Sequence, residues 1–459
     1  MTTQVEFDLD LIRRYDKSGP RYTSYPTAME FSSEVGAEEH ARHLRASNES
    51  MRPLSLYVHI PFCASVCYYC ACNKVVTGDR CKAGPYVEYL GREIRLQSSL
   101  VDPNRVVTQL HWGGGTPTFL SDDEIRDVMR AIRANFRLLD DDSGEYSIEI
   151  DPRELRPYSM VVLRGVGFNR VSLGVQDFDP AVQKAVHRVQ PEDVTLRALT
   201  DARDLGFRSI NIDLMYGLPL QTVDTFSSTL DKVLELRPDR LSVFNYAHLP
   251  TRFKPQRRIN EDELPPPEAK LEIMRLTVER LTAMGYQYIG MDHFALVDDE
   301  LSVAQRNGSL HRTFQGYSTH ANTDLIAMGV SAISAIDGCY TQNHVTVDDY
   351  YRELEAARFP VYRGYELNDD DRIRADVIQR LVCHGEVVAA DVERRFGIEF
   401  DAYFSTELVA LARMADDGLV EIGSGRMVAT PRGRFLIRHL CKVFDRYRNT
   451  GEAGFSKII

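Results

Sequence analysis

The sequence predicts an α/β protein built on a partial (β/α) barrel. From about residue 54 onward, short apolar runs rich in β-branched residues alternate with loops and amphipathic helical stretches. Alternation at about 30–40 residues per unit is typical of parallel strands joined by right-handed crossovers. Polar residues recur where successive predicted strands end, which is the active face of such barrels. About six units fit here, enough for a full or partial barrel.

The expected strands are apolar runs bounded by glycine or polar residues. They cover residues 54–60, 109–112, 146–150, 170–175, 209–215, 241–246 and 288–291. Helical spacing of apolar residues predicts helices between them, for example over 122–135, 223–235 and 267–284. The polar groups at the predicted strand ends are Gly113 to Pro117, Glu149 with Asp151, Gln176 with Asp177, Asp213, Tyr246 with His248, and Asp292 with His293.

Two segments flank the predicted catalytic domain, which covers residues 51–364. Residues 1–50 are polar, and the prolines and glycine near residue 20 disfavour a helix. Arg21, Tyr22 and Tyr25 favour an ordered N-terminal arm over a disordered tail. Residues 365–459 are expected to be mostly helical, with a hairpin around residues 423–425 that makes the domain resemble a winged helix. Scattered acidic residues there argue against DNA binding, so a lid or docking role is favoured.

Composition narrows the class of protein. The chain has 459 residues, is 43% hydrophobic and carries a formal net charge of −12. This balance disfavours a nucleic-acid or membrane-surface protein. The first residues lack the basic and apolar stretches of a signal peptide, and no apolar run is long enough to span a membrane. We therefore expect a cytoplasmic protein with thiol cysteines.

Cys63, Cys67 and Cys70 form the most informative motif, C-x3-C-x2-C. Three thiolates at this spacing can hold three irons of a 4Fe-4S cluster and leave the fourth iron open for chemistry. A zinc site would normally need a second cysteine pair downstream, and a disulfide framework is typical of small secreted chains. Cys72 lies beside the motif, but its spacing alone does not make it a ligand.

Three consecutive glycines, Gly113 to Gly115, follow the second predicted strand. The segment is neither a Walker loop nor a dinucleotide fingerprint. Bare backbone at a strand end lets a ligand approach the main chain closely. A tight turn without a ligand is the alternative, but beside the cysteine motif a surface for a small zwitterion such as an amino acid is favoured.

Together, the cysteine motif and the Gly-Gly-Gly-Thr-Pro loop resemble the radical S-adenosylmethionine (radical SAM) superfamily. The chain is similar nearly end to end to one of its families, the oxygen-independent coproporphyrinogen III oxidases (dehydrogenases). The segments that carry this resemblance cover residues 19–28, 57–63, 148–154, 174–178, 211–219, 241–250, 290–294 and 314–317. The resemblance implies a barrel of the radical SAM type.

The resemblance also implies the site residues. Cys63, Cys67 and Cys70 would bind one 4Fe-4S cluster, while Cys72 would line the site without binding iron. A first S-adenosylmethionine would contact Tyr57, Gly114, Glu149 and Ile333. A second would contact Tyr69, Gly115, Thr116, Gln176, Arg188, Asp213 and Ala247. Glu149 and Asp213 suit ribose hydroxyls or a cationic group, and Arg188 suits a carboxylate.

The implied reaction removes carbon dioxide from two propionate side chains of coproporphyrinogen III, by way of a 5′-deoxyadenosyl radical, and gives protoporphyrinogen IX. The implied partners are this substrate and a flavodoxin- or ferredoxin-like electron donor, with a monomer expected. The arginines that could hold the substrate carboxylates are Arg21, Arg188, Arg257, Arg258 and Arg312. The alternatives are a haem-binding chaperone of the same superfamily, disfavoured by Cys72 and the arm, and a radical enzyme acting on another substrate.

Overall fold

The computed structural model describes residues 5–15 and 19–447. The chain forms two compact units. Unit 1 contains residues 1–30, 266–321 and 367–459, and unit 2 contains residues 31–265 and 322–366. The predicted boundary at residue 364 lies close to the end of unit 2. Residues 1–30 and 266–321, which the sequence divided between an arm and the catalytic domain, instead pack with the C-terminal segment.

Six parallel strands form the centre of unit 2, as the sequence predicts. Their order is β9-β8-β7-β6-β4-β1, and each neighbouring pair is parallel. Because the strands are parallel, their carboxyl ends meet at one edge of the sheet. The strands are β1 (Leu54–Ile60), β4 (Val106–Gly114), β6 (Glu145–Ile150), β7 (Arg170–Gln176), β8 (Ser209–Tyr216) and β9 (Arg240–Asn245), with the short β5 (Arg137–Leu138) beside β4.

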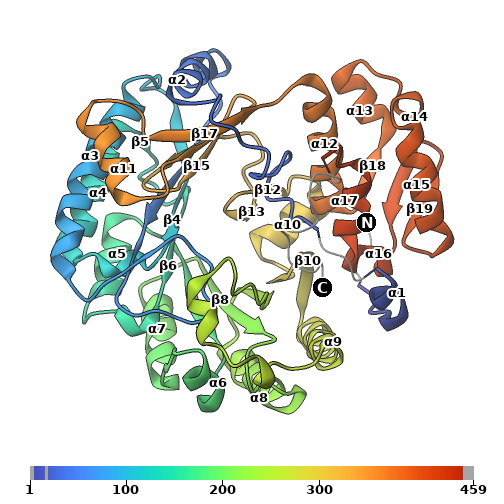
Figure 1. Cartoon of the computed structure of the whole chain (residues 1–459), viewed down its shortest axis with the longest axis horizontal. Coiled ribbons are helices and arrows are strands. Elements are labelled where there is room, and N and C mark those ends of the chain that lie inside the picture. Colours follow the sequence, from blue (N-terminus) through green and yellow to red (C-terminus); the bar gives the residue numbers. More distant parts are fainter. Residues whose placement is uncertain (1–4, 16–18, 448–459) are drawn as a thin grey trace. The chain divides into compact units, whose positions relative to one another are not determined.

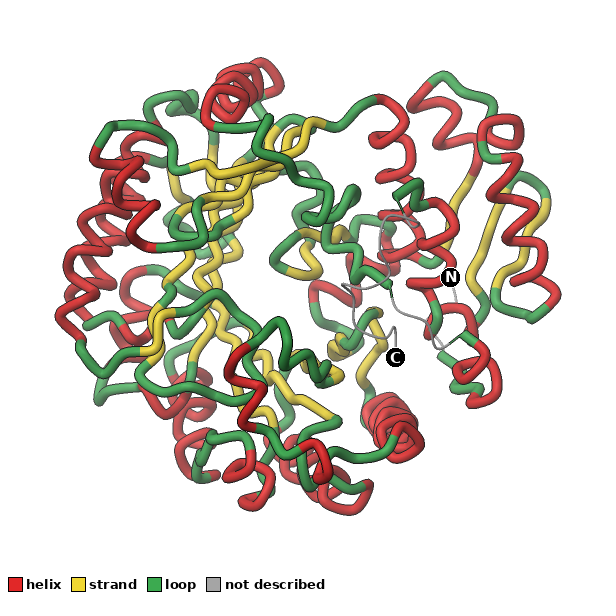
Figure 2. The backbone as a smooth tube through the Cα atoms, viewed as in Figure 1, coloured by secondary structure: helices red, strands yellow, loops and turns green. Residues whose placement is uncertain are grey.

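Helices connect these strands and cover the outer side of the sheet (Figure 2). The sequence places their starts well: Ser121 and Glu124 form a capping box at the start of α4, and Thr222 caps α8. The predicted helices over 122–135 and 223–235 are therefore confirmed to within a residue. The connecting helices are α3 (Ala83–Ser98), α4 (Asp122–Asn135), α5 (Ser159–Val166), α6 (Pro180–Ala185), α7 (Glu192–Asp204) and α8 (Val223–Leu236).

The sequence did not predict the strands that extend the sheet beyond β1. β14 (Asp324–Met328) pairs with β1 in parallel, and β15, β16 and β17 follow as antiparallel neighbours. β14, β15 and β16 are joined by short links, and only between β16 and β17 does a helix, α11, intervene, so most of the strand–helix rhythm is absent here. Their bounds are Ile333–Ile336, Cys339–Asn343 and Val361–Glu366, and the helices of this part are α2 (Ala37–Ala46) and α11 (Val347–Glu355).

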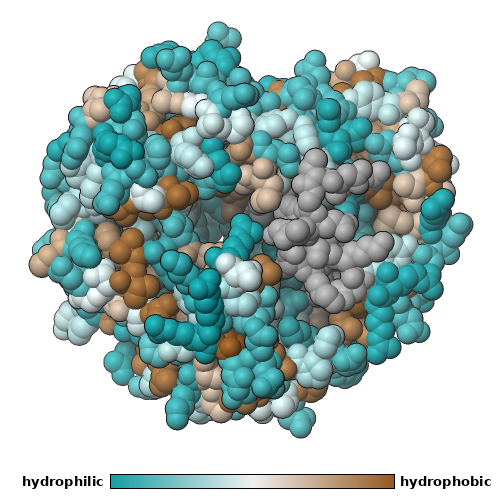
Figure 3. Space-filling view, in the orientation of Figure 1, coloured by the Kyte–Doolittle hydropathy of each residue, from teal (hydrophilic) through white to brown (hydrophobic). Residues whose placement is uncertain are grey.

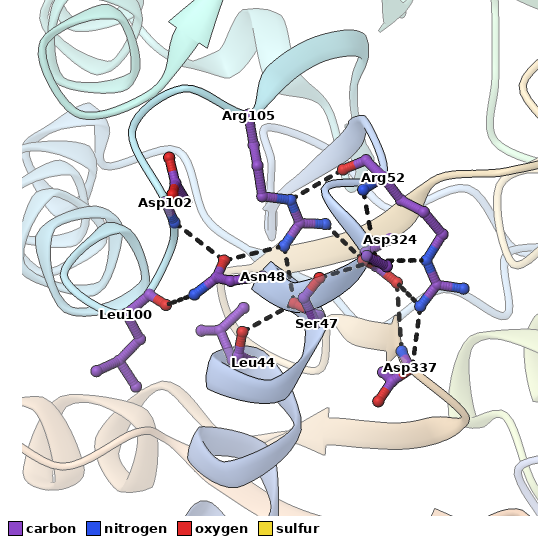
Figure 4. A network of polar contacts seen from close by, with 10 residues as sticks. Leu44, Ser47, Asn48, Arg52, Leu100, Asp102, Arg105, Asp324 and Asp337 are labelled. Carbon is purple, nitrogen blue, oxygen red and sulfur yellow. Dashed lines mark hydrogen bonds and ion pairs between the residues drawn. The ribbon is translucent and has the colours of Figure 1, made fainter.

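A buried ion pair lies at the amino end of these strands (Figure 4). Asp324, the first residue of β14, bonds to Arg105, and both side chains are at most 2% exposed. The same aspartate contacts Arg52 at 3.0 Å. Arg105 also donates to the Arg52 carbonyl at 2.9 Å and to Ser47 Oγ at 2.8 Å. The network ties the segment before β1 to β4 and β14.

Unit 1 combines two hairpins with a mostly helical C-terminal segment. β10 pairs with β11 in antiparallel fashion, and β12 pairs with β13. The predicted strand 288–291 corresponds to β10, which belongs to the large sheet and pairs with its neighbour β11 as a hairpin. Asp292 has a φ of +78° and lies with His293 at the turn of this hairpin. The elements are α9 (Pro267–Ala283), β10 (Tyr286–Gly290), β11 (His293–Leu296), α10 (Glu300–Asn307), β12 (His311–Thr313) and β13 (Gly316–Ser318).

The C-terminal segment matches the predicted helices and hairpin (Figure 1). β19 and β20 are joined by Ser424 and Gly425, both with positive φ, as a two-residue type I′ turn requires. β18 pairs with β20 to complete a three-stranded sheet. The bounds are α12 (Asp369–His384), β18 (Glu386–Val388), α13 (Ala389–Phe396), α14 (Phe400–Tyr403), α15 (Ser405–Asp416), β19 (Val420–Gly423), β20 (Arg426–Ala429), α16 (Pro431–Phe435) and α17 (Ile437–Phe444).

The N-terminal residues are ordered as part of unit 1. Tyr22 and Tyr25 are each 3% exposed and belong to its hydrophobic core. Arg438 of α17 donates to the backbone carbonyls of Gly19 and Pro20. The helix α1 (Leu9–Arg14) adds further apolar side chains. The arm therefore contributes to the packing of unit 1, so the expectation from its sequence that it serves the substrate site rather than folding is wrong in its second part. Residues 16–18 lie outside the described part.

The visible surface is mostly hydrophilic, with apolar side chains scattered among the polar ones (Figure 3). Isolated exposed apolar residues such as Val189 and Val409 are normal for a folded protein. Within the described ranges, every helix is too short or too polar to cross a bilayer.

Candidate functional site

The carboxyl edge of the parallel sheet in unit 2 brings most predicted site residues together. Glu149 is the penultimate residue of β6, Tyr57 lies in the middle of β1 and Asp213 lies in the carboxyl half of β8. Gln176 is the last residue of β7, and Ala247 follows β9. Parallel pairing places all these strand ends at the same edge. The recurrence of polar residues in the sequence thus reflects a shared location.

The cysteine loop is anchored beside the end of β1. Cys63 belongs to the short strand β2 (Phe62–Cys63), which pairs in parallel with β3 (Val75–Val76). The Thr77 amide donates to the Cys63 carbonyl at 2.9 Å, and the Cys70 amide donates to the Cys67 carbonyl at 3.2 Å. The loop that carries the three thiols is therefore closed at its base.

Hydrogen-bond donors surround the sulfur atoms. Arg188 Nη1 lies 3.5 Å and Arg153 Nη2 lies 3.6 Å from Cys67 Sγ. Thr116 Oγ1 donates to Cys63 Sγ at 3.5 Å. Cations and hydroxyl donors favour the thiolate, which is the form that binds metals.

The pKa values of the thiols differ. The hydrogen bond from Cys72 and the charge of Lys74 lower the pKa of Cys70, against the effect of burial. Burial raises the pKa of Cys63 to about 11, and the hydrogen bond from Thr116 offsets this only in part. Metal binding removes the proton from a coordinating thiol in either case.

The spacing of the three cysteine sulfurs differs from that of a single-ion site. Among residues 5–15 and 19–447, no three His, Cys, Asp or Glu side chains are close enough together to hold one metal ion. In a cubane cluster each cysteine binds a different iron, so the sulfurs need not meet at one point.

The glycine loop lies against the base of the cysteine loop. The Gly115 amide donates to the Ile60 carbonyl and the Thr116 amide to the Phe62 carbonyl, both at 2.8 Å. A Cβ at Gly115 would lie 2.6 Å from the Pro61 carbonyl oxygen. A Cβ at Gly114, whose φ is +113°, would lie 2.6 Å from the His59 ring. The absence of side chains is thus needed for the close packing of the two loops.

Glu149 is held by neighbours on both sides. His111 Nε2 lies 3.3 Å from its Oε1, and the Gly114 amide donates to Oε2 at 3.2 Å. Burial alone would raise the pKa of Glu149, but the hydrogen bonds and the charge of His111 hold it below its usual value. With 45% of its side chain still accessible, this carboxylate can accept a further bond from a ligand. Tyr57 stacks on His111 with ring centroids 5.9 Å apart.

Asp213 lies in a second polar group on the same edge. Ser172 donates to its Oδ2 and Asn211 to its Oδ1, each at 2.8 Å. Burial and the negative charge of Glu149 together raise the pKa of Asp213 to about 6, against the hydrogen bonds from Ser172 and Asn211. A cation close to both carboxylates would relieve this repulsion.

Arg188 connects the cysteine loop to the strand ends. Its Nη1 contacts Asp151 at 2.9 Å, and its Nη2 donates to the Gly174 carbonyl at 2.6 Å. Its Nε is buried with no hydrogen-bond partner among the described residues. Gln176, with a φ of +71°, begins the loop after β7. The side chains of Gln176 and Arg188 both approach Gly174. A Cβ built on this glycine would lie 3.3 Å from Nε2 of Gln176 and 3.1 Å from Nη2 of Arg188.

Sequence reasoning missed one residue that links two predicted contacts. Gln256 is 1% exposed, and its amide nitrogen donates to the carbonyls of Tyr69 at 3.0 Å and Ala247 at 3.2 Å. It thereby joins the cysteine loop to the segment after β9. A lone glutamine in a short 3₁₀ turn carries no recognisable pattern. Arg153 was missed as well, although it lies in a quoted segment.

The remaining predicted residues have less specific surroundings. Ile333 is the first residue of β15 and is partly exposed. Arg257 donates to the Pro250 carbonyl, and Arg258 lies over the Tyr68 ring at 5.4 Å. Arg21 and Arg312 belong to unit 1.

Comparison with known proteins gives a consistent result. Residues 57–233 match the Radical SAM superfamily, and residues 367–436 match the HemN C-terminal domain. The chain is 54% identical to the oxygen-independent coproporphyrinogen III oxidase of Pseudomonas aeruginosa, with 100% of both chains covered. It is 50% identical to the enzyme of that name from Escherichia coli, with 99% of both covered.

A solved structure agrees with these sequence matches. Coproporphyrinogen III oxidase (HemN) from Escherichia coli, described as a Radical SAM enzyme, superposes with a TM-score of 0.92 at 48% identity. The superposition covers 97% of this chain and 100% of that chain.

Proposed function

Since this chain belongs to the oxygen-independent coproporphyrinogen III oxidases of the Radical SAM superfamily, we propose that it carries out their reaction in porphyrin and haem biosynthesis. In this reaction, two propionate side chains of coproporphyrinogen III lose carbon dioxide and become vinyl groups, giving protoporphyrinogen IX. The observation that supports this most directly is the cysteine loop, which lies against the glycine loop at the carboxyl edge of the parallel sheet.

Superfamily membership implies one 4Fe-4S cluster and S-adenosylmethionine. We propose that Cys63, Cys67 and Cys70 bind the cluster. When bound by these three residues, the cluster would supply one-electron reduction of S-adenosylmethionine and so the radical chemistry of the reaction, with the electron coming from an external donor. Arg188, Arg153 and Thr116 stabilise the ligand sulfurs by the contacts described above.

We also propose two S-adenosylmethionine positions. The group around Glu149 includes Tyr57 and Gly114, with Ile333 as a further contact, and takes the first molecule. The second group is formed by Tyr69, Gly115, Thr116, Gln176, Arg188, Asp213 and Ala247. The mutual repulsion of Glu149 and Asp213 supports a cationic sulfonium or amino group close to both.

The remaining roles concern partners and location. We propose a flavodoxin- or ferredoxin-like electron donor, a monomeric enzyme and a cytoplasmic location. All eight cysteines are free thiols, which suits a reducing compartment.

The test is an anaerobic assay with reconstituted protein, coproporphyrinogen III, S-adenosylmethionine and a reductant. We expect protoporphyrinogen IX, carbon dioxide and 5′-deoxyadenosine as products, with about four irons bound per chain. Replacing Cys63, Cys67 or Cys70 by Ser should abolish both iron binding and turnover, whereas Cys72→Ser should retain the bound iron. Cys81→Ser, at an exposed position, is the matched control. Turnover without iron, or an intact cluster in Cys63→Ser, would contradict the proposal.

A further inference from the structure

Arg312 of β12 is a buried cation with unsatisfied nitrogens. The residue is 4% exposed, and its Nε and Nη1 atoms have no hydrogen-bond partner in the described part of the chain. The neighbouring buried Arg438 donates instead to the Gly19 and Pro20 carbonyls. Leaving donors of a buried guanidinium unpaired costs about 1–3 kcal/mol or more. Packing alone therefore gives no reason for an arginine at this position.

The guanidinium is held in place by an aromatic ring. Its central carbon lies 4.6 Å from the centroid of the Tyr317 ring on the paired strand β13. The Tyr317 hydroxyl donates to the Val382 carbonyl at 3.2 Å, which fixes the ring. The ring contacts the face of the guanidinium, whereas its N–H bonds lie in the plane of the group. The N–H groups therefore stay available for an acceptor in that plane.

The surroundings of Arg312 carry more positive than negative charge. Burial and then the charges of Arg21 and Arg312 lower the pKa of Arg438 to about 10. Burial and then the charge of Arg312 lower the pKa of His293 to about 4, so this ring is neutral at pH 7. The nearby carboxylate Asp292 is paired with Arg21 at 2.6 Å. An anion brought to Arg312 would be attracted by the positive charge of Arg312 itself and of the neighbouring Arg438.

We propose that Arg312 binds a carboxylate of the substrate. This inference rests on the proposed function, because the four propionates of coproporphyrinogen III are the anions that the reaction brings. A carboxylate oxygen would accept a charge-assisted hydrogen bond from Nε or Nη1 in surroundings shielded from water. Arg21 adds attraction at longer range and stays paired with Asp292.

The alternative is a purely structural arginine that is stabilised by its ring contact. The two roles predict opposite effects of Arg312→Met, which keeps the length of the side chain and removes the charge. For a structural arginine, this change should lower stability and leave substrate affinity unaltered. For a substrate-binding arginine, stability should be retained or increased, because an uncompensated buried charge is removed. Affinity should then fall by about 10- to 100-fold, the range that a charged hydrogen bond supplies.

The experiment measures anaerobic binding of coproporphyrinogen III to the reconstituted full-length enzyme by equilibrium dialysis, with the tetramethyl ester as a neutral comparator. We expect wild type to prefer the acid over the ester and Arg312→Met to lose much of that preference, with S-adenosylmethionine affinity and iron content unchanged. Arg394→Met, whose side chain is 77% exposed in the same unit, is the control and should bind as wild type does.

Arg312→Lys covers the case in which the methionine variant fails to fold. It keeps the charge but not the planar donors, so weakened binding is again expected. Unchanged affinity in a folded Met or Lys variant would overturn the role of Arg312 and leave the proposed function intact. Failure of wild type to bind or convert coproporphyrinogen III would overturn both.

Discussion

The buried pair of Arg105 and Asp324 provides a sharp test of what stabilises unit 2. Asp324→Ala would leave the Arg105 guanidinium with no carboxylate at a position that is 0% exposed. Three neutral acceptors would remain on the Arg52 carbonyl, Ser47 and Asn48. Breaking a buried pair from one side typically costs 3–5 kcal/mol. The remaining acceptors place the expected loss at the low end, about 3 kcal/mol, or a fall in Tm of about 5–10 °C.

The assay is thermal unfolding followed by circular dichroism, together with a double variant. Replacing both partners, Arg105→Met with Asp324→Leu, should recover most of the loss, because well-packed apolar residues can replace a buried pair without net cost. Glu88→Ala, in an exposed pair with Arg92, should change stability by less than about 0.5 kcal/mol. A double variant no more stable than Asp324→Ala, or a single variant as stable as wild type, would refute the reasoning. Iron content should stay unchanged, because the pair lies at the amino ends of the strands.

Three further predictions concern the arm, Asp213 and Glu93. Deleting residues 1–28 should lower the thermal midpoint of unit 1, because Tyr22 and Tyr25 are lost from its core. Porphyrinogen turnover should fall sharply, while iron remains bound in unit 2. Loss of the iron or an unchanged midpoint would contradict this prediction. Asp213→Asn should retain fold and cluster but reduce decarboxylation on the order of 100-fold, so a folded and fully active variant would exclude a cofactor role. Burial raises the pKa of Glu93 to about 7, so its folded form holds a proton that the unfolded chain releases at lower pH. Stability should therefore fall by about 1–3 kcal/mol as pH rises from about 4.5 to 7. Glu93→Gln should flatten this dependence in denaturant titrations, and an unaltered pH profile would contradict the assignment.

The parallel strands and the site residues at their ends could be predicted because one repeating pattern carries both. Glu149 and Asp213 follow β-branched runs, and parallel pairing then brings them to one edge. Gln256 and Arg153 could not be found in this way, since each contributes through a single hydrogen-bonding group. The unpaired donors of Arg312 depend on packing, which no sequence pattern reveals.

The strands after β14 were missed for a different reason. Their pairing is antiparallel, and no helical stretch separates β14, β15 and β16, which are joined by short links. The hairpin of β10 and β11 shows the same limit. Its first strand resembles a barrel strand in composition, and the chain reverses through positive φ values at Gly290, Met291 and Asp292.

The three glycines at the end of β4 also determine how this segment can vary during evolution. A methyl group at Gly113 would meet the Glu149 side chain, one at Gly114 the His59 ring, and one at Gly115 fixed main-chain atoms. The first collision could be relieved by a rotation that displaces Glu149, whereas the third has no relief. A compensating second mutation is therefore conceivable for Gly113 but not for Gly115. Saturation mutagenesis under selection for haem synthesis should therefore recover substitutions at Gly113 more often than at Gly115.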